Sequence, residues 1–262
     1  MLKESYKQYC NTATLSLFII LLFNNSWVAA GEVSVAVASN ALQAVKEIKA
    51  RFEKKTGDKV LISSGSTGKL YTQIVNGAPF DIFLAANARE PKRLEQAHDI
   101  VPGSRKTYAV GRLVLWNNSQ QEKSGTTVQQ LLSSPDLKRI TLANPKTAPY
   151  GYAAQQYLQA MKLWETLQSK LIRAENVTQA FQFTQSQNVQ LGFVALSQIK
   201  GYQRKINAND YWLVPQKFYN PIEQQGVILM RAKNNASAKE LMSYLHSKQI
   251  KQLLAEHYGY GA

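Results

Sequence analysis

The chain has 262 residues, with 31 Lys and Arg against 17 Asp and Glu, and a formal net charge of +14. Its basic residues are scattered and are not interleaved with aromatic residues as in RNA-binding signatures, so we exclude nucleic acid as a partner. A solvated basic surface is the favoured interpretation, and a long-range field that attracts small anions comes second.

The N-terminal segment has the parts of a secretory signal peptide. A positively charged start is followed by a short apolar run at 15–23 and by the small residues Val28-Ala29-Ala30 before Gly31. A membrane span needs about 20 apolar residues, so we predict that residues 1–30 are a signal peptide for export to the periplasm, with an uncleaved anchor as the alternative. The only cysteine, Cys10, lies here, so we expect a mature chain without disulfides.

From Val33 the chain alternates short apolar runs with helical patterns. In chain order we predict a strand at 33–38, a helix from 42 that ends near 56–57, a strand at 60–64, a helix at 70–76 and a strand at 81–85. Strands that alternate with helices in this way are typical of a largely parallel sheet with helices on its faces.

A second unit of the same kind follows the Pro102-Gly103 break. We predict an extended run at 108–116, strands at 140–143, 171–174, 191–195 and 226–230, helices at 153–163 and 177–184, and a helical tail over 241–254. The fold class is therefore α/β, with two Rossmann-like lobes that have central mixed sheets and are joined by two crossover strands near 108–116 and 223–230.

The crossovers predict how the chain is divided. We assign residues 31–111 and 219–262 to lobe I and residues 112–218 to lobe II. Ligands of open α/β sheets bind outside the carboxyl ends of the strands, so we expect the site in a cleft between the lobes, with hinged closure around the ligand.

Two loops in the first lobe carry hydroxyl side chains at strand-to-helix junctions. Ser39 and Asn40 follow the first strand, and Ser66 and Thr67 follow the second. Either pair could simply cap its helix. Two such junctions in one lobe also suit an oxyanion, because helix N-termini present free N–H groups and partial positive charge.

The Ser66 loop permits one enzyme alternative. A phosphate-binding P-loop is excluded, because only two residues separate Gly65 from Gly68-Lys69 and Leu70 follows the lysine. Ser66 and Lys69 match the S-x-x-K pattern of serine acyl enzymes, but the companion motifs come in the wrong order. This alternative is kept at low weight.

Other chemistry has weaker support. His98, His246 and His257 lack metal-ligand spacing, so we predict no metal site. In the second lobe, helix-initial loops could present the backbone N–H groups of Tyr150 and Val177 across the cleft, although periodicity alone does not place them there.

Several segments, in order along the mature chain, together form a recognisable pattern: Val37-Ala38-Ser39-Asn40, residues 62–70, residues 74–81, Ala143-Asn144-Pro145, residues 148–151 and residues 191–195. Through these segments the sequence resembles the periplasmic molybdate-binding proteins of molybdate ABC transporters. The resemblance implies a type II periplasmic binding protein fold. It also implies a non-enzymatic, monomeric protein without a cofactor, which captures molybdate or tungstate for a membrane ABC permease.

The resemblance also implies a set of ligand-binding residues. The oxyanion would be held by Ser39, Asn40, Ser66 and Thr67 from lobe I and by the backbones of Tyr150 and Val177 from lobe II. Some members add a tyrosine hydroxyl at the position of Ala195, a contact that is missing here and for which Asn40 could compensate. Another tetrahedral oxyanion such as sulfate is the alternative ligand.

Overall fold

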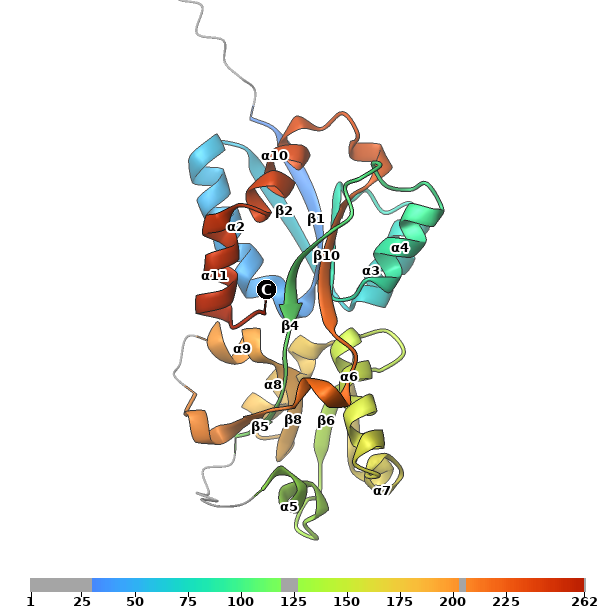
Figure 1. Cartoon of the computed structure of the whole chain (residues 1–262), viewed down its shortest axis with the longest axis vertical. Coiled ribbons are helices and arrows are strands. Elements are labelled where there is room, and N and C mark those ends of the chain that lie inside the picture. Colours follow the sequence, from blue (N-terminus) through green and yellow to red (C-terminus); the bar gives the residue numbers. More distant parts are fainter. Residues whose placement is uncertain (1–29, 119–126, 203–205, 262) are drawn as a thin grey trace, which may run out of the picture. The chain divides into compact units, whose positions relative to one another are not determined.

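The computed structural model describes residues 30–118, 127–202 and 206–261. Residues 31–262 form one compact unit, shown in Figure 1. The predicted signal peptide lies outside the described residues except for Ala30. No helix among the described residues is long and apolar enough to cross a membrane.

The first sheet has the strand order β2-β1-β3-β10-β4. Its strands are β1 (Glu32–Ala38), β2 (Lys59–Gly65), β3 (Ile82–Ala85), β4 (Lys106–Gly111) and β10 (Ile222–Ile228). β1 is parallel to β2 and β3, whereas β10 is antiparallel to β3 and β4, so the sheet is mixed.

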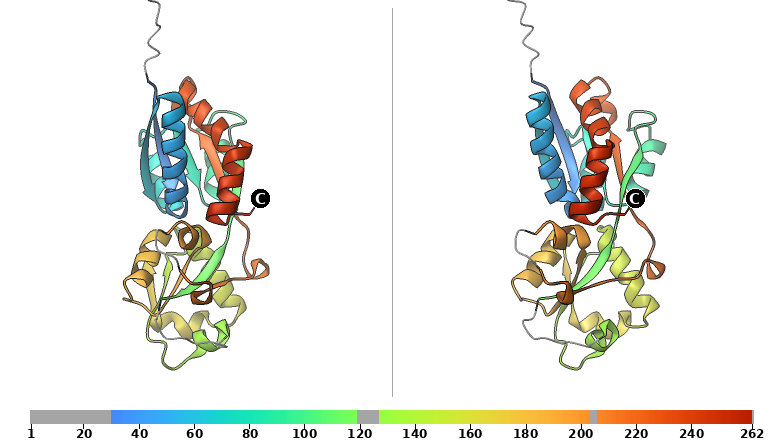
Figure 2. Two further views of the ribbon diagram at one scale, coloured as in Figure 1. Left: turned by 90° about the vertical axis from the view of Figure 1, so that its left-hand side faces the viewer. Right: turned by 60° about the vertical axis from the view of Figure 1, so that its left-hand side comes forward.

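Helices cover both faces of this sheet (Figures 1 and 2). They are α2 (Leu42–Thr56), α3 (Thr67–Val75), α4 (Arg89–Gln96), α10 (Ala236–Leu245) and α11 (Lys248–Tyr258). Alternate residues of β1 point to opposite faces, so Val35 and Val37 pack in the cluster of α2, α10 and α11, while Ala36 packs in that of α3 and α4. A strand that is buried on both faces explains the nearly continuous apolar run at 33–38.

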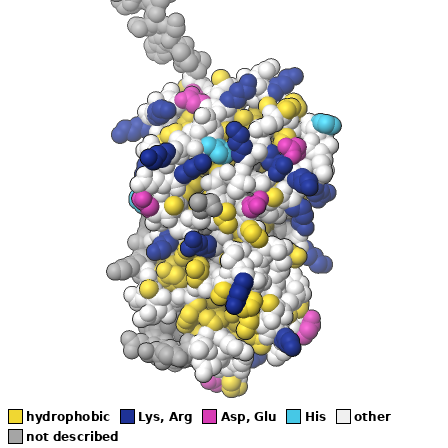
Figure 3. Space-filling model, viewed as in Figure 1, with side chains coloured by type: hydrophobic (Ala, Val, Ile, Leu, Met, Phe, Trp, Pro, Cys, Tyr) yellow, Lys and Arg dark blue, Asp and Glu magenta, His cyan; other side chains and the backbone are white. Residues whose placement is uncertain are grey.

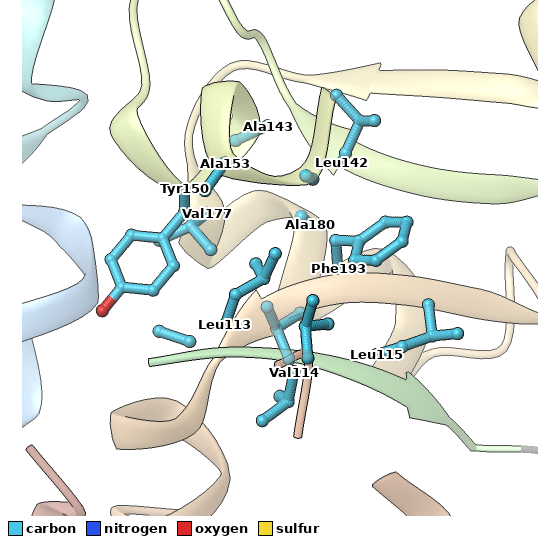
Figure 4. Close-up of a cluster of buried hydrophobic side chains, with 14 of the residues drawn as sticks. Leu113, Val114, Leu115, Leu142, Ala143, Tyr150, Ala153, Val177, Ala180 and Phe193 are labelled. Atoms are coloured by element: carbon cyan, nitrogen blue, oxygen red, sulfur yellow. The ribbon is translucent and has the colours of Figure 1, made fainter. Parts of the chain in front are cut away.

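The second sheet has the matching order β7-β6-β8-β5-β9. Its strands are β5 (Leu113–Asn117), β6 (Ile140–Ala143), β7 (Leu171–Ala174), β8 (Leu191–Ala195) and β9 (Tyr211–Leu213). The helices of this part are α5 (Val128–Ser133), α6 (Pro149–Ala160), α7 (Trp164–Leu167), α8 (Val177–Gln185) and α9 (Leu196–Lys200). Their apolar side chains form one core, part of which Figure 4 shows around Leu113, Leu115 and Phe193. The described residues also form short 3-10 helices, namely η1 (Ser39–Ala41), η2 (Gln168–Lys170), η3 (Ala208–Asp210), η4 (Gln216–Phe218) and η5 (Met230–Ala232).

The α/β class with two central mixed sheets is confirmed, but the run at 108–116 is two strands rather than one. β4 ends at Gly111 in the first sheet, and β5 begins at Leu113 in the second, so the chain changes sheets at Arg112. It returns between β9 and β10. The predicted division into lobe I (31–111 and 219–262) and lobe II (112–218) stays a prediction, and the two lobe names are used below in that sense.

Further boundaries differ from the prediction. α3 begins at Thr67 rather than at 70, directly after the loop residue Ser66. α6 begins at Pro149, four residues early, because proline is well suited to the first turn of a helix. The last strand begins at Ile222 rather than at 226. The helical tail is two helices, because the Ser247 side chain caps a new helix by accepting a hydrogen bond from the backbone N–H of Ile250.

Candidate functional site

A pocket of about 190 Å³, a volume that includes its opening to solvent, lies where strands of both sheets end. All six residues predicted to bind the ligand line it: Ser39, Asn40, Ser66, Thr67, Tyr150 and Val177. The remaining lining residues are Ala38, Gly65, Ala86, Ala148 and Pro149. None of these lining side chains is charged, so the groups that can contact a bound anion are neutral donors and helix ends.

The Ser39 loop leads directly into a helix without a side-chain cap. Ala38 and Ala41 occupy the N-cap positions of η1 and α2, and no side chain bonds the free N–H groups at either position. The alternative in which Ser39 or Asn40 acts as the cap is therefore wrong. The first N–H groups of a helix have no intrahelical partner, so those of η1 remain available to a ligand.

The Ser66 loop presents two buried hydroxyl groups with different surroundings. Ser66 occupies the N-cap position of α3 but makes no capping hydrogen bond, and its Oγ is buried without a partner. The Oγ1 of Thr67 accepts a hydrogen bond of 3.0 Å from the backbone N–H of Ala86. A hydroxyl that accepts one hydrogen bond still has its proton to donate, so both groups can serve as donors to an anion.

The second-lobe wall is built from two helix N-termini. Pro149 and Tyr150 begin α6, and Val177 is the first residue of α8. The Oδ1 of Asn176 accepts hydrogen bonds from the N–H groups of Thr178 and Gln179, at 3.0 and 3.1 Å. This cap does not use the N–H of Val177, which stays available at the pocket.

The Tyr150 side chain points away from the rest of its apolar cluster (Figure 4). A Cβ added to Gly111 would lie only 2.2 Å from the Tyr150 hydroxyl, which places that hydroxyl against the crossover. The hydroxyl is buried beside the Asn40 side chain, and burial raises its pKa well above the usual value although the Asn40 amide partly opposes this. The phenol is therefore neutral at physiological pH.

Contacts between described residues join the two lobes around the pocket. The N–H of Gly68 donates to the carbonyl oxygen of Thr147 at 2.9 Å, and the Oγ1 of Thr178 donates to the carbonyl oxygen of Ser39 at 3.1 Å. The Oγ of Ser197 donates to the carbonyl oxygen of Asn40 at 2.9 Å. The Nζ of Lys69 lies 2.8 Å from the Oε1 of Glu175.

The serine acyl enzyme alternative has little support in this geometry. An activated serine requires a general base within hydrogen-bonding reach, whereas the Oγ of Ser66 has no partner. Lys69 is half exposed, and its Nζ pairs with the Glu175 carboxylate instead of bonding the Ser66 hydroxyl. Within the described residues no group of three or more His, Cys, Asp or Glu side chains is placed to hold a metal ion.

Other positions singled out by the sequence lie outside the pocket lining. Ala195 ends β8, is fully buried, and donates its N–H to the Oε1 of Gln198. The basic side chains are scattered over the face shown in Figure 3 and form no single patch there. The structure adds Ala86 and Asn176, which orient Thr67 and cap α8. Asn176 had a sequence signal, because asparagine is a preferred N-cap, but Ala86 had none.

The chain belongs to a family of bacterial extracellular solute-binding proteins, whose model matches residues 33–261. It is 45% identical over 234 residues to the molybdate-binding protein ModA of Azotobacter vinelandii, covering 88% of this chain and 90% of that protein. It is 40% identical to the protein of the same name from Rhodobacter capsulatus, covering 88% of this chain and 89% of that one. Among solved structures, the periplasmic molybdate-binding protein of A. vinelandii matches with a TM-score of 0.81 at 37% identity, covering 88% of this chain and 99% of that chain.

Proposed function

We propose that this protein captures molybdate, and also tungstate, for delivery to a membrane ABC permease. The observation that carries the proposal is the pocket in which the buried, unpartnered hydroxyl of Ser66 lies among the N-termini of helices from both lobes. The likeness to the molybdate-binding proteins of A. vinelandii and R. capsulatus supports the same ligand.

The donor set suits a fully deprotonated dianion. Ser39, Ser66 and Thr67 supply hydroxyl groups, and the loops at Asn40, Tyr150 and Val177 supply backbone N–H groups. A site that contains only hydrogen-bond donors favours a fully deprotonated anion, which has no proton that would need an acceptor. The dipoles of the helix ends stabilise its charge without a desolvated lysine or arginine. Sulfate has the same charge and a smaller size, so discrimination depends on the size of the cavity.

The contacts between the lobes couple binding to closure. Hydrogen bonds from Gly68, Thr178 and Ser197 cross between the lobes beside the pocket, so the lobes close around the bound anion. In this function the protein is a monomeric carrier without catalysis or a cofactor. Residues 1–30 direct it to the periplasm and are then removed.

Calorimetric titration of the chain from Gly31 onward with molybdate, tungstate and sulfate tests the proposal. We expect saturable binding of molybdate and tungstate and much weaker binding of sulfate. No heat with molybdate, together with saturable heat with sulfate or phosphate, would overturn it. The acyl enzyme alternative predicts a mass increase at Ser66 after treatment with a β-lactam or a phosphonate, and an unmodified intact mass excludes it.

A further inference from the structure

Asn40 is held by hydrogen bonds from three distant parts of the chain. Its Nδ2 donates to the Oε1 of Gln224 at 2.8 Å and to the hydroxyl of Tyr260 at 3.0 Å. Its carbonyl oxygen accepts from the Oγ of Ser197 at 2.9 Å and from the Tyr260 hydroxyl at 3.4 Å. All four residues are at least nine-tenths buried.

These contacts define what Asn40 can offer a ligand. An amide nitrogen carries two protons, and those of Asn40 are directed to Gln224 and Tyr260. The side chain is therefore not a donor to the oxyanion and does not replace the tyrosine hydroxyl that is missing at Ala195. What Asn40 offers the pocket is its backbone N–H at the start of η1.

Gln224 connects Asn40 to the strand that returns from the second lobe. Its Nε2 donates to the carbonyl oxygen of Ile222 at 2.9 Å, while its Oε1 accepts from Asn40. Ile222 pairs with Gly111, next to the other crossover, and the register of β10 shifts between Gln224 and Gln225. A β-bulge re-aims side chains, and here it accompanies a fully buried glutamine that faces the site loop.

Tyr260 connects Asn40 to the same region from the C-terminus. The next residue, Gly261, exchanges two backbone hydrogen bonds with Val110, of 2.8 and 3.0 Å. Val110 immediately precedes Gly111, the last residue of β4. Both partners of the Asn40 side chain are thus anchored beside the points where the chain passes between the lobes.

We propose that Gln224 and Tyr260 are positioning residues of the binding site, which hold Asn40 so that its backbone N–H meets the oxyanion when the lobes close. This inference rests on the proposed capture of molybdate. Ser197, on α9 of the second lobe, donates a hydrogen bond to the Asn40 carbonyl oxygen. Asn40 is therefore held both by residues near the crossovers and by a residue of the opposite lobe.

The test measures molybdate affinity and the melting temperature of the ligand-free protein for Gln224→Met and Tyr260→Phe. Each substitution removes a bond to the Asn40 side chain while nearly keeping the volume. We expect each to weaken molybdate binding about 3- to 10-fold at a temperature where the protein is fully folded. The matched control is Tyr258→Phe, whose hydroxyl donates to the Oε2 of Glu47 instead, and which should bind molybdate as tightly as the unmodified protein.

A second measurement separates positioning from general stability. Gln224→Met is repeated in an Asn40→Ala background, where we expect no further loss of affinity because Gln224 bonds only the side-chain amide of Asn40. Tyr260→Phe should keep part of its effect there, because the Tyr260 hydroxyl also donates to the Asn40 carbonyl oxygen. A loss from Gln224→Met that adds in full to that of Asn40→Ala, or unchanged affinity in both single variants, would overturn the inference while molybdate binding by the unmodified protein stands. If the unmodified protein does not bind molybdate, the proposed function fails and this inference fails with it. Tyr260→Phe removes a single oxygen atom and decides the question if Gln224→Met does not fold.

Discussion

The hydroxyl of Thr67 and the backbone N–H of Ala86 are joined by a hydrogen bond of 3.0 Å, which links the start of α3 to the residue that follows β3. The bond uses an acceptor position of the hydroxyl and leaves its proton to donate. Thr67 is 1% exposed and lines the pocket, so this geometry orients a donor toward the ligand.

Replacing Thr67 by alanine should weaken both binding and folding. A lost hydrogen bond to a charged ligand costs about 1.5–3 kcal/mol, or roughly 10- to 150-fold in affinity. The unfolding free energy should also fall by about 1–3 kcal/mol, because the Ala86 N–H becomes unsatisfied. Titration calorimetry and urea unfolding measure the two effects. Thr67→Ser keeps the hydroxyl and is the control, and unchanged molybdate affinity in Thr67→Ala would remove this residue from the site.

For Ser66→Ala we expect molybdate affinity to fall without a loss of stability in the ligand-free protein. The Ser66 hydroxyl is buried without a protein partner, so its removal should leave the ligand-free protein equally stable or more stable. Molybdate affinity should nevertheless fall, because a donor to the anion is lost. Ser64→Ala, at an exposed position of β2, is the matched control and should change neither quantity. A destabilised Ser66→Ala variant with normal affinity would assign the hydroxyl a structural role.

Much of the first-lobe half of the site followed from local sequence. Strand ends and helix starts are read from periodicity, and the carboxyl ends of parallel strands meet at one edge of a sheet, so Ser39 and Ser66 could be placed together. Tyr150 and Val177 could not be placed in this way. Their relation to the first lobe is set by the packing of the lobes, and they entered through the resemblance instead.

The long-range contacts of Asn40 and the change of sheet at Arg112 had no local signal. Asn40 meets Gln224 and Tyr260 across 184 and 220 positions of sequence, so nothing near Asn40 indicates that its amide is already engaged. The apolar run at 108–116 continues through the crossover, because residues on both sides of Arg112 are buried in sheets. Alternation reports burial and does not report which sheet buries a residue.

The buried tyrosines make stability fall at high pH. Burial raises the pKa of Tyr108, Tyr150 and Tyr260, in the last case to about 12. In the unfolded chain these groups lose their protons near pH 10, whereas the folded chain retains them. The unfolded state then binds fewer protons, so the unfolding free energy should be unaffected by these groups below about pH 10 and should decline from there toward pH 12. Urea unfolding between pH 8 and 11.5 measures this, and Tyr260→Phe should show a shallower decline.

Asn176 permits stability and affinity to be separated at the second-lobe wall. Asn176→Ala removes the cap from Thr178 and Gln179 and should lower the unfolding free energy by about 0.5–2 kcal/mol. Asn176→Asp keeps the cap and places a negative charge at a helix N-terminus, so stability is kept, but that charge repels the bound dianion next to Val177. Asn235→Asp, at the cap of α10 and outside the pocket lining, is the control and should leave molybdate affinity unchanged. Equal affinities for the two aspartate variants would contradict the assignment of Val177 to the site.

Substitutions of the two members of the Lys69–Glu175 ion pair should change molybdate affinity by different amounts. Both side chains are about half exposed, so the pair itself contributes only about 0.2–1 kcal/mol to holding the lobes together. Each residue lies two positions from a pocket-lining residue, Thr67 or Val177, so their charges also act on the bound dianion. Lys69→Met leaves an unpaired carboxylate beside that dianion and should weaken molybdate binding roughly 2- to 5-fold at low salt. Glu175→Gln loses the ion pair but also loses the repulsion, so its affinity should equal or exceed that of the unmodified protein. Both changes in molybdate affinity should shrink above about 0.15 M salt, where the screening length is about 8 Å. Titration calorimetry at two ionic strengths measures these changes. Equal losses of affinity from the two substitutions would mean that the ion pair acts by holding the lobes together and not by neutralising the charge of Glu175.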